Sequence, residues 1–267
     1  MMNSCKTARS FLLILVPVAV IGFWIGVESV LQRIPVAANA LRIYPLLKTA
    51  PYLLALAGVF TAEKITAGLS WADSLAKFGF KWPQPHQIQP ALTGIVILAV
   101  GYRLAIQYSA EPLTIQPNWP SNALKYFIQA ELSEEILFRG FLFRHLRTNM
   151  TFWRAAIING AAFGLIHLFN FTNGFTPEIV TNVAISITFG FLLTFPLAAL
   201  FEVGGGSLLG GVIFHFGVDT VNLFDNVGPT PMLICLGTAA FAGMILFIQV
   251  YRTLQSRTSA PSGTVQT

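Results

Sequence analysis

The feature that most constrains this chain is a series of apolar runs, each 18 to 25 residues long, that contain few charged side chains. Only 10% of the residues are charged, against about 25% in soluble domains. In lipid every backbone polar group must be satisfied within the protein, so a membrane-spanning chain forms helices or a closed barrel. The runs do not alternate with a period of two, which indicates helices. The sequence therefore predicts an all-α fold, a polytopic transmembrane helical bundle.

About eight transmembrane helices are expected. The first run follows basic residues, as in a signal peptide, but it is too long for the apolar region of one and is interpreted as an uncleaved span. The eight expected spans are Phe11–Leu31, Ile43–Ala62, Ile88–Gln107, Ala123–Leu146, Phe152–Phe171, Ile179–Val203, Ser207–Phe224 and Pro231–Tyr251. The segment 63–87 predicts a short amphipathic helix on the inner membrane surface, with an ordinary loop as the alternative.

Lysine and arginine are distributed unevenly between the two predicted sides of the membrane. With the N-terminus inside, the inner segments hold Lys6, Arg9, Lys64, Lys77, Lys81, Arg144, Arg147, Arg154, Arg252 and Arg257, and the outer side holds Arg33, Arg42, Lys48, Arg103 and Lys125. Cytoplasmic loops carry the excess of these residues. The sequence thus predicts a multi-pass protein of the plasma membrane with both termini in the cytoplasm. Because the basic residues are scattered singly, no nucleic-acid partner is expected.

The fourth run contains charged groups that membrane helices ordinarily avoid, since each costs about 2.5–3.5 kcal/mol at a helix centre. It reads Glu131-Leu-Ser-Glu134-Glu135-Ile-Leu-Phe-Arg139. On an α-helix Glu135 lies one turn before Arg139, so these two are expected to pair and to leave Glu134 on a neighbouring face. Carboxylates crowded in a low dielectric cannot all ionise cheaply, and one of them is a candidate general base. The alternative, charges that mark an interfacial helix end, fits the later arginines better.

Two later runs each carry a histidine. The fifth contains Phe163-Gly-Leu-Ile-His167, and the seventh contains His215-Phe-Gly-Val-Asp219, which places a histidine and a carboxylate one turn apart. A single buried histidine is more often a core residue than a catalyst. Ionisable groups on three apolar helices form a different pattern, because together they supply bases, hydrogen-bond donors and metal ligands to one cavity. The seventh run also contains Gly206-x-x-x-Gly210, which is typical of close helix packing.

Together these motifs resemble the CAAX protease and bacteriocin-processing family (CPBP, or Abi), which comprises membrane-embedded endopeptidases related to the type II CAAX prenyl endopeptidase. The matching elements are Glu134-Glu135-x-x-x-Arg139, Phe163-x-x-x-His167 and His215-x-x-x-Asp219, in order on successive expected helices between about Ala123 and Phe224. Three parts are expected. The apolar pattern predicts N-terminal transmembrane helices with an amphipathic cytoplasmic loop over 1–110, and the resemblance implies a CPBP-like catalytic core over 120–255. The polar composition, rich in Ser and Thr, predicts a disordered tail over 256–267.

The resemblance also implies catalytic roles. Glu134 and His167 would activate a water for peptide hydrolysis, and Glu135 and Arg139 would form a supporting pair. His215 and Asp219 would stabilise the tetrahedral oxyanion. An aspartate donates a hydrogen bond only when it is protonated, so orienting His215 and binding a metal are alternative roles for the last residue of the motif.

The expected cofactor is either none or one divalent metal such as zinc. Two histidines and a glutamate are a feasible zinc set that leaves one position for water, as in an intramembrane metalloprotease. No His-Glu-x-x-His motif is present, however, and the metal-free mechanism is preferred.

The sequence thus predicts an intramembrane endopeptidase that hydrolyses a peptide bond of a membrane-associated protein or peptide by Glu/His-activated water. Its partners would be the lipid bilayer and a substrate that enters from the cytoplasmic side; lipidation of the substrate follows from the CAAX analogy alone. One alternative is a non-proteolytic membrane immunity or scaffold protein of the same fold. Another is a small transporter, which the lack of an inverted repeat disfavours.

Overall fold

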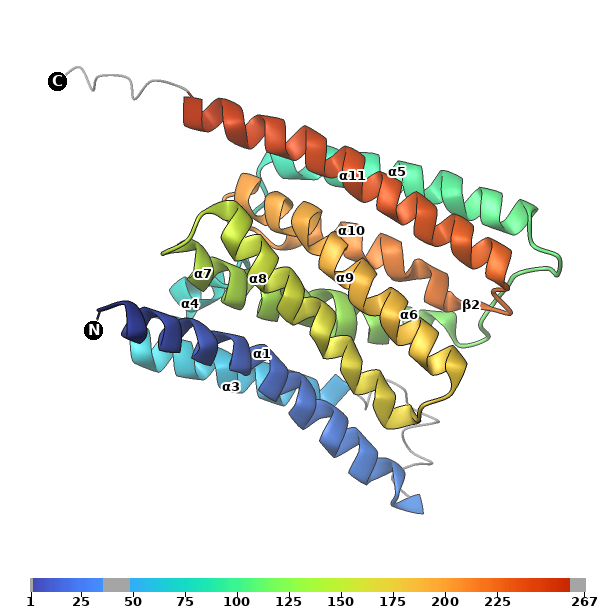
Figure 1. Cartoon of the computed structure of the whole chain (residues 1–267), viewed down its shortest axis with the longest axis horizontal. Coiled ribbons are helices and arrows are strands. Elements are labelled where there is room, and N and C mark those ends of the chain that lie inside the picture. The colour runs from blue at the N-terminus through green and yellow to red at the C-terminus, as the bar shows by residue number, and fades with distance from the viewer. Residues whose placement is uncertain (1, 36–48, 260–267) are drawn as a thin grey trace.

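The computed structural model describes residues 2–35 and 49–259 and shows an all-α fold, as predicted (Figure 1). Its only strands in this part of the chain are a short antiparallel pair that sets Thr114 opposite Asp225. In chain order the elements are α1 (Met2–Gln32), α3 (Ala50–Ala67), α4 (Trp71–Lys77), α5 (Pro85–Gln107), β1 (Thr114–Ile115), α6 (Trp119–Tyr126), η2 (Phe127–Leu132), η3 (Glu135–Phe143), α7 (Arg144–Arg147), α8 (Phe152–Leu165), η4 (Ile166–Asn173), α9 (Pro177–Val203), α10 (Leu209–Asp219), η5 (Thr220–Leu223), β2 (Phe224–Asp225) and α11 (Pro229–Ser259).

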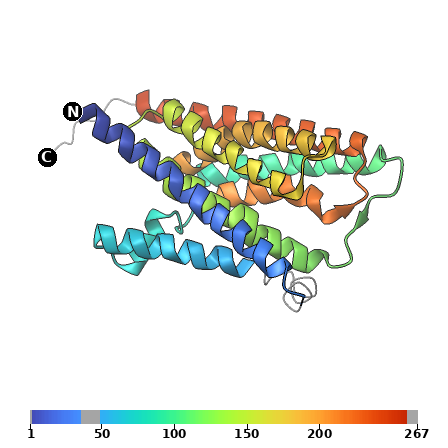
Figure 2. The ribbon, with the colours of Figure 1, turned by 60° about the horizontal axis from the view of Figure 1, so that its bottom comes forward.

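The helices form a bundle whose long axis is horizontal in Figures 1 and 2. The pair α1 and α3 lies on one side, the pair α5 and α11 on the other, and α8, α9 and α10 lie between them. The start of α1, the end of α11, α4 and α7 share one end of the bundle. Helix α6, β2 and the start of α9 lie at the opposite end. These two ends differ in charge and in access to the interior, as described below.

Four helices in the described ranges are long and apolar enough to cross a membrane, or five if one bent helix pair counts as a span. They are α5, α8 with the start of η4, α9 and α11, and they correspond to the third, fifth, sixth and eighth predicted spans. The chain is therefore a multi-pass membrane protein, but the predicted count of about eight is not confirmed. The apolar segments Ile14–Val27 and Leu209–Leu223, within the first and seventh predicted spans, are shorter than 18 residues.

The fourth predicted span is not one regular α-helix. It is divided into α6, η2, η3 and α7, of which η2 and η3 are π-helices. A π-helix forms i→i+5 hydrogen bonds and is rare outside short, often functional, segments. The wider turn differs from the 3.6-residue spacing assumed above. It follows that the face on which each charged residue lies has to be taken from the structure.

The predicted amphipathic segment contains the short helix α4. Helix α3 ends at Gly68, whose φ of 63° needs no strain in glycine, and α4 then runs at 112° to α3. The Ser70 side chain caps α4 by accepting a hydrogen bond from the backbone N–H of Asp73. Trp71 is exposed, but Phe78, directly after α4, is wholly buried in the core. The segment therefore packs on the protein interior at Phe78 and exposes apolar surface at Trp71.

Two predicted features extend beyond the described residues. The first part of the second predicted span, residues 43–48, lies outside them, and the observed helix α3 begins at Ala50. Helix α11 continues to Ser259, so it includes the first residues of the predicted tail. The remainder of that tail, residues 260–267, lies outside the described residues.

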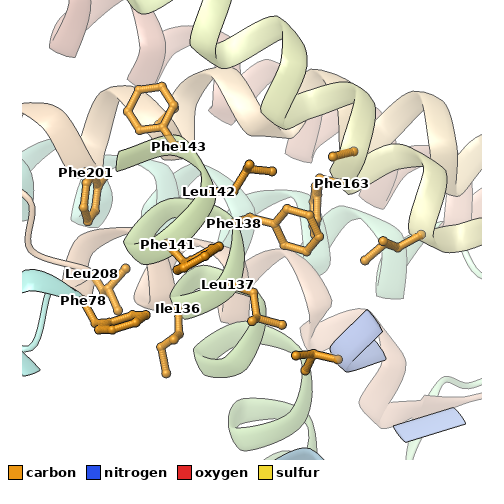
Figure 3. Packing of buried hydrophobic residues seen from close by; sticks show 14 of the residues in the cluster. Phe78, Ile136, Leu137, Phe138, Phe141, Leu142, Phe143, Phe163, Phe201 and Leu208 are labelled. Carbon is orange, nitrogen blue, oxygen red and sulfur yellow. The ribbon is translucent and has the colours of Figure 1, made fainter. Parts of the chain in front are cut away.

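The main hydrophobic cluster surrounds η3 (Figure 3). Along η3 every residue from Glu135 to Phe143 is buried. Large aromatic and aliphatic side chains from α8, α9 and the segment after α4 pack on it; the labelled residues are Phe78, Ile136, Leu137, Phe138, Phe141, Leu142, Phe143, Phe163, Phe201 and Leu208. This apolar packing covers Glu135 and Arg139, the charged residues of η3, on the side that faces α7.

The turn between α9 and α10 depends on a buried glutamine of α5. Gly205 and Gly206 have φ values of 64° and 81°, so the glycines form a tight turn and Gly206 is not part of a helix, contrary to the packing motif predicted from the sequence. Gln87 donates from Nε2 to the carbonyl oxygens of Ser207 (2.6 Å) and Leu200 (3.2 Å). This side chain therefore joins α5 to both ends of the turn.

We expect Gln87→Leu to lower the free energy of unfolding by about 1–3 kcal/mol, because two buried carbonyls lose their donor. Gln89→Leu is the matched control: the residue is exposed on the same helix, and its replacement should change stability by less than about 0.5 kcal/mol. Thermal unfolding in detergent measures both. Equal losses in the two variants would contradict the proposed role of Gln87.

Candidate active site

A buried ion pair forms the centre of the site. Nη1 of Arg139 lies 2.9 Å from Oε1 of Glu135, and both side chains are almost completely buried. Nη2 of Arg139 donates to the hydroxyl of Thr194 on α9 at 3.3 Å, and the guanidinium carbon lies 4.7 Å from the ring centroid of Phe163 on α8. The pairing predicted from the sequence is observed. Contacts with three elements thus fix the position of Arg139.

The same carboxylate holds the histidine of α10. Nδ1 of His215 donates to Oε1 of Glu135 at 3.1 Å, and Nε2 lies 3.8 Å from Oδ2 of Asp219. Gly211 permits this approach, because a Cβ at that position would lie 2.9 Å from Oε2 of Glu135. The carboxylate can only accept, so the proton of this hydrogen bond is on Nδ1. The other nitrogen, Nε2, faces Asp219. Glu135 therefore orients His215.

A cavity of about 580 Å³ lies beside this chain of contacts. Glu134, His167, His215 and Asp219 all line it; Glu134 lies between η2 and η3, His167 in η4, and the last two both in α10. The other lining residues include Tyr52, Phe163, Asn170, Asn182, Phe189, Leu193 and Asn222. The structure therefore places four of the six predicted site residues on one cavity. The other two, Glu135 and Arg139, lie behind it in the core.

Glu134 and Glu135 are adjacent in sequence but differ in environment. Glu135 is buried and paired, whereas Glu134 is partly exposed on the cavity and makes no ion pair with a described residue. His167 follows α8 in the 3₁₀-helix η4, where its ring packs edge-on against Phe163 with centroids 5.7 Å apart. A Cβ at Gly190 of α9 would lie 3.2 Å from Nε2 of His167, so the glycine leaves room for the ring.

The predicted metal ligands do not form a metal site in this arrangement. Within residues 2–35 and 49–259, no three His, Cys, Asp or Glu side chains are grouped closely enough to hold a metal ion. One nitrogen of His215 is already bonded to Glu135. The residues that are present thus do not fit the zinc alternative as they stand, and no step below depends on a metal.

Several residues of the site were not predicted from the sequence. Thr194 could have been noticed as a polar side chain within an apolar run. Tyr52 gave no such signal, because its role depends on the packing of α3 against the core. Its hydroxyl is buried, finds no hydrogen-bond partner among the described residues, and belongs to a side chain that lines the cavity. Its ring packs edge-on against Trp24 of α1.

Glu131 is separate from the cavity, although it belongs to the same motif region. Its side chain is wholly buried, and neither carboxylate oxygen has a partner among the residues described. It does not line the cavity. Glu131 therefore offers a comparison for Glu134: it is the same residue type three positions earlier, without access to the cavity.

We expect Arg139→Ala to lower the free energy of unfolding by about 3–5 kcal/mol, because Glu135 loses its buried partner. Arg147→Ala is the control. Arg147 pairs with Glu202 through two 2.7 Å hydrogen bonds, which raise the pKa of its guanidinium, but both side chains are partly exposed. Its loss should cost about 1 kcal/mol or less. Membrane abundance and thermal stability in detergent measure both, and a larger loss for Arg147→Ala would contradict the argument.

The matching segment of a known family coincides with this cluster. Residues 116–221 match the family described as type II CAAX prenyl endopeptidase Rce1-like. No curated protein matches the chain significantly. The matched segment includes all six predicted site residues, and the N-terminal helices lie outside it. The resemblance predicted from the motifs is thus confirmed, because residues 116–221 are similar to the Rce1-like family of type II CAAX prenyl endopeptidases.

Proposed function

We propose that this protein is an intramembrane endopeptidase that hydrolyses a peptide bond by a water activated between Glu134 and His167. The observation that supports this most is the shared cavity, on which Glu134, His167, His215 and Asp219 meet although they are up to 85 positions apart in the chain. Its walls are largely apolar, so the few polar groups at its inner end act in a low dielectric. The family match agrees with a protease.

In the proposed reaction Glu134 accepts a proton from water while the water oxygen bonds to the carbonyl carbon of the substrate. His167 holds the water by a hydrogen bond. The tetrahedral oxyanion forms beside Nε2 of His215, which donates a hydrogen bond to it when the ring carries a proton on both nitrogens. The C–N bond then breaks as the proton passes from Glu134 to the departing amine. A positioned base of this kind contributes about 10²–10⁴-fold to a rate.

Glu135 and Arg139 have a supporting role in this proposal. They do not line the cavity, and they act through His215. Asp219 lies on the cavity side of the same ring, 3.8 Å from its Nε2. This distance exceeds a hydrogen bond, so Asp219 adjusts the electrostatics of His215 or contacts the substrate. The substrate is a membrane-associated protein or peptide; lipidation of it rests on the CAAX analogy.

The proposed location is the plasma membrane with both termini in the cytoplasm. This orientation rests on the distribution of lysine and arginine along the chain. It determines which compartment each end of the bundle faces.

We expect Glu134→Gln to abolish cleavage while the protein accumulates normally, because the amide keeps the shape of the side chain but cannot act as a base. Glu131→Gln is the matched control, with the same substitution in the same segment but away from the cavity, and it should retain cleavage. Because no substrate is identified, the measurement compares new N-termini of membrane proteins, by mass spectrometry, between cells that express wild type and each variant.

An equal set of new N-termini in wild type and Glu134→Gln would contradict the protease and favour the immunity or scaffold alternative. Loss of cleavage in Glu131→Gln with normal folding would indicate that Glu131, and not Glu134, is the general base. An internally quenched CAAX peptide, with and without a farnesyl group on its cysteine, tests in detergent whether lipidation matters.

Tyr52→Phe tests whether the N-terminal helices take part in the reaction. The substitution removes only a buried hydroxyl that has no partner among the described residues, so stability should not fall. If the hydroxyl donates to the reacting carbonyl, kcat should fall about tenfold or more with little change in KM. Tyr126→Phe is the control on the same cavity. An unchanged kcat for Tyr52→Phe would show that Tyr52 only lines the cavity and does not donate to the reacting carbonyl.

A further inference from the structure

Four exposed residues line the cavity and form its rim: Ile185 of α9 and three asparagines. Asn170 lies in η4, Asn182 near the start of α9, and Asn222 in η5. From this rim the lining continues inward to Phe163 and His215, which are 1% and 4% exposed. The cavity thus opens toward the end of the bundle that holds α6 and β2 (Figures 1 and 2).

The opposite direction is closed. Helix η3 begins directly after the cavity residue Glu134 and runs toward Arg144 at the other end, and Phe138, Leu142 and Phe143 are almost completely buried along it. Phe201 of α9 and Leu208 pack on the same cluster (Figure 3). A substrate therefore has no path through this apolar layer to Glu134.

The closed end is the basic end. Among residues with described side chains it carries Lys64, Lys77, Lys81, Arg144, Arg147, Arg154 and Arg252, whereas the open end carries Arg33, Arg103 and Lys125. Acidic residues lie at both ends, with Glu111, Glu178 and Asp225 at the open end and Glu63, Asp73 and Glu202 at the closed end, so the two ends differ in their basic residues. Because lysine and arginine are enriched in cytoplasmic loops, the closed end faces the cytoplasm.

We propose that the cavity opens to the extracytoplasmic side and receives its substrate from there or from the outer half of the bilayer. This inference rests on the proposed function for the identity of the site, and it replaces the cytoplasmic entry expected from the sequence. That expectation arose because the carboxylates and the cytoplasmic arginines belong to one predicted span. In the structure the buried segment η3 separates them.

The rim and walls indicate the chemistry of the substrate. Amide side chains both donate and accept hydrogen bonds without charge, which suits the exposed main chain of an extended peptide. Trp24, Phe169, Phe189 and Leu193 line the cavity and suit apolar side chains. The substrate class is therefore an extended, largely apolar segment of a membrane-anchored protein or peptide exposed outside the cytoplasm.

Cysteine labelling tests the side of the opening. In a background with Cys5→Ser and Cys235→Ala, we expect a membrane-impermeant maleimide to label Asn222→Cys and Asn170→Cys in intact cells. Thr148→Cys and Asn149→Cys, both exposed in the turn after α7, are the matched variants at the closed end and should be labelled only after the membrane is opened. Labelling of all four variants after permeabilisation shows that each cysteine is accessible, and an unchanged thermal stability in detergent shows that each variant has folded.

The reverse pattern in intact cells would overturn the proposal and restore cytoplasmic entry. The new N-termini give a second measurement, because they should fall on extracytoplasmic segments. New N-termini on cytoplasmic segments would refute substrate entry from the extracytoplasmic side but would agree with the proposed protease activity. The labelling does not depend on activity, so an inactive protein with the expected labelling would refute the proposed function alone.

Discussion

The site depends on the ion pair between Glu135 and Arg139 within an apolar bundle. A charge in such an interior is stable only when it is paired and hydrogen-bonded. Here the partners come from several elements: Thr194 from α9, the ring of Phe163 from α8, and His215 from α10. The requirement to satisfy one buried pair therefore fixes how these helices are placed around η3.

The ion pair also gives the two adjacent glutamates different surroundings. Glu135 points into the core and Glu134, its neighbour, lines the cavity. The π-helical turns of η2 and η3 lie on either side of Glu134 and set these directions. Small residues complete the arrangement, because Gly211 and Gly190 leave the space that Glu135 and His167 occupy. Polar groups are thus confined to one face of η3, and the other faces are packed with aromatic side chains.

The N-terminal helices complete the cavity although they lie outside the segment that matches the family. Trp24 of α1 and Tyr52 of α3 line it and contact each other, with ring centroids 5.4 Å apart. In the proposed reaction the motif residues supply the reacting groups, whereas these aromatic residues limit the space in front of them. What fits the cavity is therefore decided partly by a region that the motifs do not reveal.

The sequence by itself determined the helical membrane class, four of the spans and the identity of the clustered residues. Long apolar runs have few structural alternatives in lipid, and a Glu135–Arg139 pair follows from local spacing. Only the tertiary structure decided that Glu134 and Glu135 have different surroundings, that Tyr52 reaches the cavity, and that the cavity opens away from the basic end. The physical reason is that these features depend on a π-helical turn and on packing between distant helices, and residue type and local spacing encode neither.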